Sequence, residues 1–253
     1  MRVDAAALLT PRRGIVLAGV AAICMSLSNL KAGGARSGGT GTLGPPPREK
    51  SNKPTLTLVD ERLKQVKLSD TARTPILPVL KASYAIISIF DAISGMGIVK
   101  KDMVGNCDKI WGHLLDGGET LQDLCDAEIE AVGGNAERAG RVDGSACNSA
   151  LWLVRALRLV EGILKELVRD VALTLKEACL NAYAKSLKKH HNMVLKRVFG
   201  VAVNAAPDRQ TFMAKLTPAS EAEALKAISK LLPAFSKMVL AVEGYLKARG
   251  IER

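Results

Sequence analysis

The chain has 253 residues, 48% of them apolar and 4% aromatic, and its formal charge is +11. An apolar fraction of this size can fill a core, which excludes a wholly disordered chain. The scarcity of aromatic side chains argues against a stacking surface for single-stranded nucleic acid, and no apolar run reaches the roughly 18 residues that a membrane-spanning helix needs. We therefore expect one or two soluble domains, with no nucleic-acid partner.

The positive charge is unevenly distributed along the chain. Residues 1–53 contain eight basic and two acidic side chains, a net charge of +6, whereas the remaining 200 residues have a net charge of +5. A mildly basic body is compatible with weak attraction to acidic phospholipid headgroups, at about 1 kcal/mol per well-placed cation. The pattern permits a transient membrane contact and does not indicate a nucleic-acid groove.

The five cysteines predict neither a zinc site nor a disulfide framework, because they lack CxxC spacing and are odd in number. They are Cys24, Cys107, Cys125, Cys147 and Cys179. This usage is typical of a reducing compartment. No Ser/His/Asp, Cys/His or metal-ligand arrangement stands out either, so we expect no metal, no cofactor and no enzymatic activity.

The first 30 residues have the layout of a targeting segment. Arg2, Arg12 and Arg13 precede an apolar run over residues 15–25, and small polar residues follow it. This order is typical of a secretory signal or an organellar presequence, and the run is short for a membrane span. A disordered tail is the alternative interpretation of residues 1–30, and the sequence leaves both open.

Residues 31–54 are rich in glycine and proline and cannot bury enough surface to order themselves, so they are predicted to be a linker. The pattern changes at residue 55. From there to residue 253, apolar residues recur with helical spacing, and no stretch alternates as a half-buried strand would. We expect residues 55–253 to form one all-α domain.

Eight helices are predicted in this domain. Thr217 followed by Pro218 indicates a helix start, Pro233 is expected to separate the last two helices, and Gly250 lies just past the end of the last one. The predicted helices cover residues 57–67, 76–95, 100–116, 118–131, 147–171, 174–203, 218–231 and 233–248.

A polar stripe runs along the helix predicted over residues 100–116. Asp102, Asn106, Lys109 and His113 recur at i, i+4, i+7 and i+11, beside an apolar stripe that should face the core. A carboxylate, a carboxamide and an ammonium thus project from one side at the core edge. The alternative is a solvated face on which Asp102 pairs with Lys109. Gly105, inside the same helix, hints at a close approach there.

The second feature is a tryptophan on the helix predicted over residues 147–171. Trp152 and Arg155 are three residues apart and share a face that adjoins the buried one. Trp152 is either a core residue or a flat platform for a sugar ring, because the axial C–H groups of a sugar favour an aromatic face.

The third feature is a pair of histidines in the helix predicted over residues 174–203. Helical spacing places His191 on the apolar side with Tyr183 and Leu187, whereas His190 is rotated by about 100°. Adjacent histidines on a helix cannot chelate one metal. His191 is therefore either a satisfied core residue or a hydrogen-bond donor to the carbonyl of a buried ligand.

Taken together, these motifs resemble the glycolipid transfer protein family in order and spacing. The match covers roughly residues 75–250, and the agreement of several separated motifs makes it specific. The motifs are Asp102-x3-Asn106-x2-Lys109, Thr120-Leu121-Gln122 with Glu128 and Glu130, Leu151-Trp152-Leu153-x-Arg155-Ala156-Leu157-Arg158, Ala182-Tyr183, Lys188-Lys189-His190-His191, Ala205-Ala206-Pro207 and Phe212.

The resemblance implies a two-layer helical sandwich of about eight helices that moves a sphingolipid between membranes without ATP. Asp102 and Asn106 would hydrogen-bond the headgroup, and Asp102 would also accept from the ceramide amide N–H. Lys109 would contact the headgroup, Trp152 would stack beneath the first sugar, and His191 would donate to the ceramide carbonyl. An unpaired buried amide costs about 1–3 kcal/mol, so this pairing would select sphingolipids over glycerolipids, which lack the N–H.

The hydrocarbon chains of such a ligand pose a larger energetic problem. At about 0.8 kcal/mol per CH2, a long acyl chain in water costs more than about 10 kcal/mol, so a carrier needs an apolar pocket between its helix layers. Its candidate lining residues, which the sequence does not distinguish from ordinary core, are Phe90, Leu153, Leu187, Phe199 and Phe212.

Two positions favour the neutral-glycolipid branch of the family. The branch that carries ceramide-1-phosphate has a lysine in place of Asn106 and an arginine in place of Trp152, because a phosphate prefers cationic forks. We therefore expect a glycosylceramide ligand. Ceramide-1-phosphate is the alternative within the same class, with Lys109, Arg155 and Arg158 as possible cationic contacts. A sphingolipid sensor or interaction protein that has lost transfer is the alternative from another class.

The family also implies where the protein acts. We expect a cytoplasmic monomer that contacts membranes transiently at their cytosolic faces, which a secretory signal in residues 1–30 would contradict. A targeted or membrane-tethered version stays open. The chain departs from the family at Met193, where a tryptophan suited to the membrane interface often follows the histidine by two residues. That departure puts the docking surface in question and leaves the headgroup site unaffected.

Overall fold

The computed structural model describes residues 46–48, 51–68, 73–116 and 118–252, all within residues 39–253. The predicted targeting segment or tail at 1–30, and most of the predicted linker at 31–54, lie outside the described residues. Apart from one isolated bridge between Pro75 and Thr120, every regular element in the described part is a helix. The all-α prediction is confirmed.

The described part contains ten α-helices and two short 3-10 helices, where the sequence predicted eight helices. Their bounds are α2 Thr55–Gln65, α3 Ile76–Ile87, η1 Ser88–Ala92, α4 Gly97–Gly112, η2 His113–Asp116, α5 Leu121–Ala131, α6 Ala136–Ala139, α7 Ala146–Arg169, α8 Leu175–Lys185, α9 Met193–Asn204, α10 Arg209–Leu216 and α11 Glu221–Ala248.

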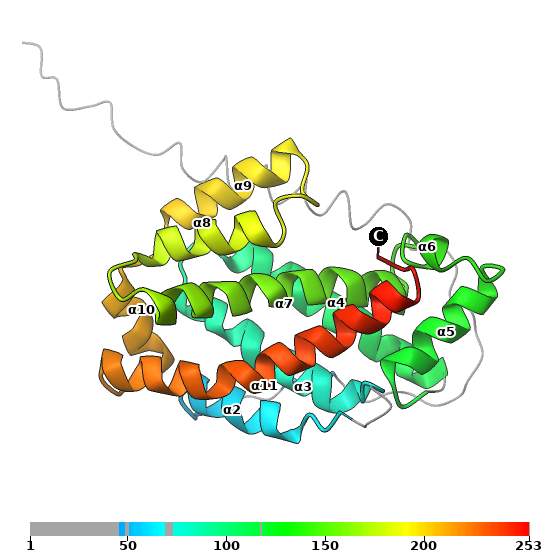
Figure 1. Ribbon diagram of the computed structural model, residues 1–253, viewed down its shortest axis with the longest axis horizontal. Helices are drawn as coiled ribbons and strands as arrows, with labels where there is room; N and C mark the ends of the chain where they lie inside the picture. The colour runs from blue at the N-terminus through cyan, green and yellow to red at the C-terminus, as the bar shows by residue number, and fades with distance from the viewer. Residues whose placement is uncertain (1–45, 49–50, 69–72, 117, 253) are drawn as a thin grey trace, which may run out of the picture. The chain divides into compact units, whose positions relative to one another are not determined.

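Helix α7 is the centre of the fold. It packs against α8, α11 and α4, while α2 packs against α3 and α11. In Figure 1, α8, α7 and α11 lie in front, with α3 and α4 behind them. The helices thus form the two layers that the resemblance implied, with the apolar core between them. None of the described helices combines the length and the apolar content of a membrane span.

A carboxylate from α5 fixes the start of α7. Glu128 accepts hydrogen bonds from the backbone N–H groups of Ala146 at 2.6 Å and Cys147 at 2.8 Å. The first N–H groups of a helix have no partner within the helix, and a negative charge there also suits the helix dipole. This contact fixes the two helices against each other, about two turns before Trp152.

The prediction of a single helix over residues 174–203 is wrong, because the structure divides this segment into α8 and α9. Ser186 follows α8 in a non-helical conformation, and its hydroxyl donates to the carbonyl four residues earlier at 2.7 Å. Asn192 then caps α9, accepting from a backbone N–H at 2.9 Å. His190 and His191 therefore lie in the turn between the two helices, so helical spacing does not apply to them.

The last two predicted helices form one element, and Pro233 does not separate them. Helix α11 runs through Pro233, although a proline inside a helix costs about 3 kcal/mol. Burial of the apolar face of α11 against α7 and α2 offsets this cost, with neighbours such as Leu231 and Phe235 fully inside the core. Tertiary packing therefore outweighs the local propensity of the proline.

The start of α11 also differs from the prediction. Thr217 and Pro218 lie before the helix, and the cap is Ser220, which exchanges hydrogen bonds with Glu223 in a capping box. The sequence prediction missed α10, whose cap Asp208 accepts from the backbone N–H of Thr211 at 2.8 Å, and it missed the single turn of α6.

Candidate functional site

Three of the predicted site residues form a polar group on α4. Asn106 is 6% exposed, and its Nδ2 donates to Oδ2 of Asp102 at 3.3 Å. The ammonium of Lys109 lies 3.5 Å from Oδ1 of Asp143, in the segment that leads into α7. The structure thus places Asp102, Asn106 and Lys109 on one side of α4, and we call them the α4 group.

Asp102 is an exposed residue whose carboxyl group is nevertheless partly desolvated by the surrounding protein atoms. Burial of its carboxyl raises its pKa above the ordinary value, and the charge of Lys109 acts in the opposite direction. A carboxyl in such a partly desolvated setting gains more from accepting an N–H or O–H donor than one in open water.

Gly105 within α4 and His113 just after it have different surroundings. Apart from its own helix backbone and chain neighbours, a Cβ atom at Gly105 would meet no described protein atom within 4 Å, so no other described part of the chain makes the close approach predicted there. His113 lies 2.9 Å from the carbonyl oxygen of Gly144 and 3.8 Å from Oε1 of Glu128. It therefore joins the end of α4 to the start of α7.

The other predicted site residues surround a half-buried tryptophan on α7. The guanidinium carbon of Arg155 lies over the Trp152 ring, 5.0 Å from its centroid. The His191 ring stacks with the same indole at 6.3 Å and an angle of 28°. Trp152, Arg155 and His191 thus form a second cluster, which we call the α7 group, and an arginine over an indole is a favourable cation–π contact.

A tyrosine from α8 orients His191. The Tyr183 hydroxyl lies 3.0 Å from Nδ1 of His191, and the Tyr183 ring stacks on Phe199 of α9 at 3.8 Å. Burial and the nearby charges of His190 and Lys196 lower the pKa of His191, so its neutral form dominates at pH 7. Burial raises the pKa of Tyr183, which keeps its phenol protonated.

Two residues that contact the α7 group were not among the predicted site residues. Glu252 pairs with Arg155 at 3.1 Å, and Oε1 of Glu252 also lies 3.8 Å from Nε2 of His190. His190 meets Trp152 edge-on at 6.4 Å. Glu252 is 97 residues from Arg155 in the chain, so no local pattern could have revealed the pair.

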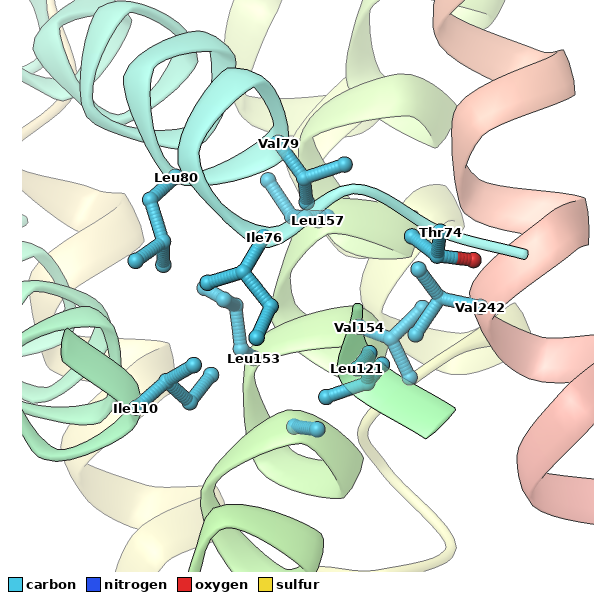
Figure 2. A pocket seen from close by; sticks show the side chains of 11 residues that line it. Thr74, Ile76, Val79, Leu80, Ile110, Leu121, Leu153, Val154, Leu157 and Val242 are labelled. Atoms are coloured by element: carbon cyan, nitrogen blue, oxygen red, sulfur yellow. The ribbon is translucent and has the colours of Figure 1, made fainter. Parts of the chain in front are cut away.

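A small apolar cavity of about 20 Å³ lies in the core between α3, α4, α5, α7 and α11. Figure 2 shows the side chains from these helices converging on it. This volume holds about one water molecule. The lining residues are Thr74, Ile76, Val79, Leu80, Ile110, Leu121, Ala150, Leu153, Val154, Leu157 and Val242.

Of the five residues predicted to line an apolar pocket, Leu153 lines this cavity. The other four, Phe90, Leu187, Phe199 and Phe212, are buried in the core outside its lining. Their part in binding hydrocarbon chains stays a prediction. A lining residue and a core residue have the same sequence signature, which is an apolar side chain on an inward-facing stripe.

Residues of both polar groups are near lining residues of the cavity in sequence. Ile110 in the cavity wall is one turn of α4 from Asn106, and Leu153 in the wall is the chain neighbour of Trp152. Helices α4 and α7 pack against each other. The fold therefore combines polar side chains and an apolar interior space along the same pair of helices.

Comparison with known proteins identifies the family. Residues 75–218 match the family model for the glycolipid transfer protein (GLTP). The pleckstrin homology domain-containing family A member 8 of Rattus norvegicus is 30% identical over 200 residues, which are 74% of this chain and 37% of that protein. Glycolipid transfer protein 1 of Arabidopsis thaliana is 30% identical over 157 residues, 60% of this chain and 74% of that protein. The chain thus spans about a third of the length of the first of these relatives.

Solved structures give the same result. The structure that describes how FAPP2 selects simple glycosphingolipids with the GLTP fold has a TM-score of 0.68 and 27% identity, covering 79% of this chain and 98% of that one. Human ceramide-1-phosphate transfer protein, bound to 12:0 ceramide-1-phosphate, shares the fold with a TM-score of 0.68 and 21% identity, covering 78% and 98% of the two chains. This chain belongs to the glycolipid transfer protein family.

Proposed function

We propose that this chain carries a sphingolipid between membranes, that residues 55–253 are its lipid-binding domain, and that its preferred ligand has an uncharged sugar headgroup. The observation that supports this most is that helices α4 and α7, which carry most of the two polar groups, pack against each other and both contribute to the wall of one apolar cavity. Such a ligand has a polar end and two hydrocarbon chains, so it needs polar partners at the mouth of an apolar space.

The α4 group would bind the amide and the first sugar. Asp102 would accept from the ceramide N–H and a sugar hydroxyl, and Asn106 and Lys109 would supply donors. A carboxylate that accepts two such bonds is better satisfied than one that, among the described residues, accepts only the 3.3 Å bond from Asn106. Glycerolipids lack the amide N–H, and this difference gives the site its selectivity.

His191 would donate to the ceramide carbonyl. If the protonated Tyr183 donates to Nδ1 of His191, the proton of the neutral imidazole is on Nε2, which can then donate to a ligand. The ring is held between Trp152 and Tyr183. Tyr183 is thus a positioning residue that sets the tautomer and the direction of the His191 donor.

The indole of Trp152 would support the sugar after the guanidinium of Arg155, which lies over the ring, moves aside. An aromatic face suits the axial C–H groups of a sugar, whereas a phosphate prefers a cationic fork. Asn106 and Trp152 both suit an uncharged headgroup. Ceramide-1-phosphate is the second candidate, because the human relative with the same fold binds it and because Lys109 and Arg155 are cations beside the site.

The hydrocarbon chains would enter the core by separating its packed side chains. The cavity of about 20 Å³ has room for about one water, far less than one acyl chain occupies. Relative to water, burying a long chain gains about 0.8 kcal/mol per CH2, so a chain that has left the membrane is strongly favoured to enter an opened core. Binding is therefore expected to move α3, α7 and α11 apart around the lining.

Helix α9 would contact the membrane. Its outward side carries Met193, Val194 and Val201, which are 67%, 48% and 66% exposed, together with the exposed Arg197. Apolar side chains beside a cation suit the boundary between headgroups and acyl chains. The contact would be transient and, as in the family, on cytosolic membrane faces.

The proposed function is tested by replacing Asp102 with valine. In a transfer assay between vesicles with labelled glucosylceramide, Asp102→Val should abolish transfer and keep the helical content, because valine cannot accept the amide N–H. Asp60→Val is the matched control, since Asp60 pairs with Lys64 within α2 and belongs to neither polar group. Transfer by Asp102→Val at the rate of the unchanged chain would contradict the assignment.

A further inference from the structure

A carboxylate from the segment after α11 lies at the α7 group. Glu252 pairs with Arg155 at 3.1 Å and lies 3.8 Å from Nε2 of His190. The three side chains are largely buried, with exposed fractions of 20%, 15% and 17%. Arg155 in turn lies over the indole of Trp152. The charge of the arginine that covers the indole is therefore balanced by Glu252.

The backbone after α11 places this carboxylate. Gly250, with φ of +74°, reverses the chain, and Ile251 N–H donates back to the carbonyl of Leu246 at 2.9 Å, as in a Schellman motif. Ile251 is 4% exposed and packs against Gly140, where a Cβ atom would come within 2.8 Å of its side chain. A turn and a buried side chain therefore anchor the residue immediately before Glu252.

We propose that Glu252 sets the charge preference of the headgroup site, favouring an uncharged sugar over a phosphate. The inference rests on the proposed function, since it concerns the same site. A phosphate beside Trp152 would bind the guanidinium of Arg155, because a planar fork matches phosphate oxygens. Glu252 already occupies Nε of that fork, and its negative charge repels a second anion in partly buried surroundings. A neutral sugar meets no such repulsion.

The test is Glu252→Gln, which removes the charge and keeps the size of the side chain. The protein is incubated with vesicles that contain equal amounts of glucosylceramide and ceramide-1-phosphate, and the extracted lipids are quantified by mass spectrometry. The ratio of ceramide-1-phosphate to glucosylceramide should rise about fivefold over that of the unchanged chain, as expected for one partly exposed ion pair.

Glu243→Gln is the matched control. Glu243 pairs with Arg158 between α7 and α11, so this variant removes an equal charge from a different ion pair and should leave the ratio unchanged.

A second readout is the pKa of His190. Burial and the charges of Arg155 and Lys189 lower this pKa, and the charge of Glu252 raises it. An NMR titration should show a lower His190 pKa in Glu252→Gln and the same value in Glu243→Gln.

The outcomes separate this inference from the proposed function. If the unchanged chain extracts glucosylceramide and Glu252→Gln has the same ratio, the inference is wrong and the proposed function stands. If Glu243→Gln raises the ratio equally, net charge and not Glu252 is responsible, and the inference is again wrong. An unaltered His190 pKa in Glu252→Gln would show that the contact is not made in solution. If the unchanged chain extracts neither lipid, both proposals fail.

Discussion

At the scale of single residues, the chemistry of the site depends on what holds each side chain in place. His191 is oriented by the Tyr183 hydroxyl at 3.0 Å and by stacking on Trp152. Its pKa is lowered by burial, so it is neutral at pH 7 and can be a donor through one nitrogen while it accepts through the other. A histidine held in this way differs from an ordinary core histidine, because the contact at Nδ1 fixes the direction in which Nε2 points.

Tyr183→Phe tests this orientation. Phenylalanine keeps the ring that stacks on Phe199 and removes the hydroxyl, so the free energy of unfolding should fall by only about 1 kcal/mol. Glucosylceramide transfer should fall about tenfold, since His191 loses the partner that sets its tautomer. Denaturant unfolding and the vesicle transfer assay measure the two effects.

Tyr84→Phe is the control for that prediction. The Tyr84 hydroxyl donates to Asp108 at 2.6 Å, so this variant also deletes a partly buried tyrosine hydrogen bond, one that does not involve His191. It should lose similar stability and keep its transfer rate. Equal transfer rates in the two variants would show that the Tyr183 hydroxyl does not position His191.

Site residues that share one helix could be predicted from the sequence. Residues that are far apart in the chain and come into contact only in the folded protein could not. Asp102, Asn106 and Lys109 recur at helical spacing on α4, so their common face was predictable. The Arg155–Glu252 pair joins residues 97 apart, and chain reversal at Gly250 brings it about. Gly250 itself was predicted as a helix end, but a helix end does not show which element the next residues will contact.

At the scale of elements, the predicted helix bounds were accurate where one apolar stripe continues without a break, and they failed where a capping residue was overlooked. Helix α7 has an apolar stripe that continues over its whole length, and its predicted range of 147–171 is close to the observed Ala146–Arg169. Helices α8 and α9 were merged because the residues between them are compatible with a helix. The cap at Asn192 was the signal for the break, and its side-chain hydrogen bond at 2.9 Å shows how the structure uses it.

That break matters for membrane binding, because it makes α9 a separate helix that packs mainly on α8. Met193→Glu should weaken sedimentation with vesicles of acidic phospholipid about tenfold, since it places a charge where an apolar side chain would enter the headgroup region. Leu240→Glu makes the same change at another exposed apolar position, on α11, and should have little effect. Equal weakening by both variants would rule out α9 as the docking surface.

At the scale of the whole molecule, the two layers enclose less space than the ligand requires. The fold class was predictable because helical spacing runs through residues 55–253 without a strand pattern. The cavity was not predictable, since only Leu153 among the five candidates lines it and the others pack elsewhere in the core. Whether an apolar side chain borders a cavity or fills the core depends on how the two helix layers pack together. The sequence of a single helix does not reveal that packing.

In the proposed mode of binding, the packed core opens to take up the chains of a sphingolipid whose amide and sugar are held at α4 and α7. Native mass spectrometry of the full chain, after incubation with phosphatidylcholine vesicles that contain glucosylceramide, tests it most directly. We predict a one-to-one complex with glucosylceramide. A protein that remains without lipid, or one that binds phosphatidylcholine equally well, would show that the core does not open for a sphingolipid.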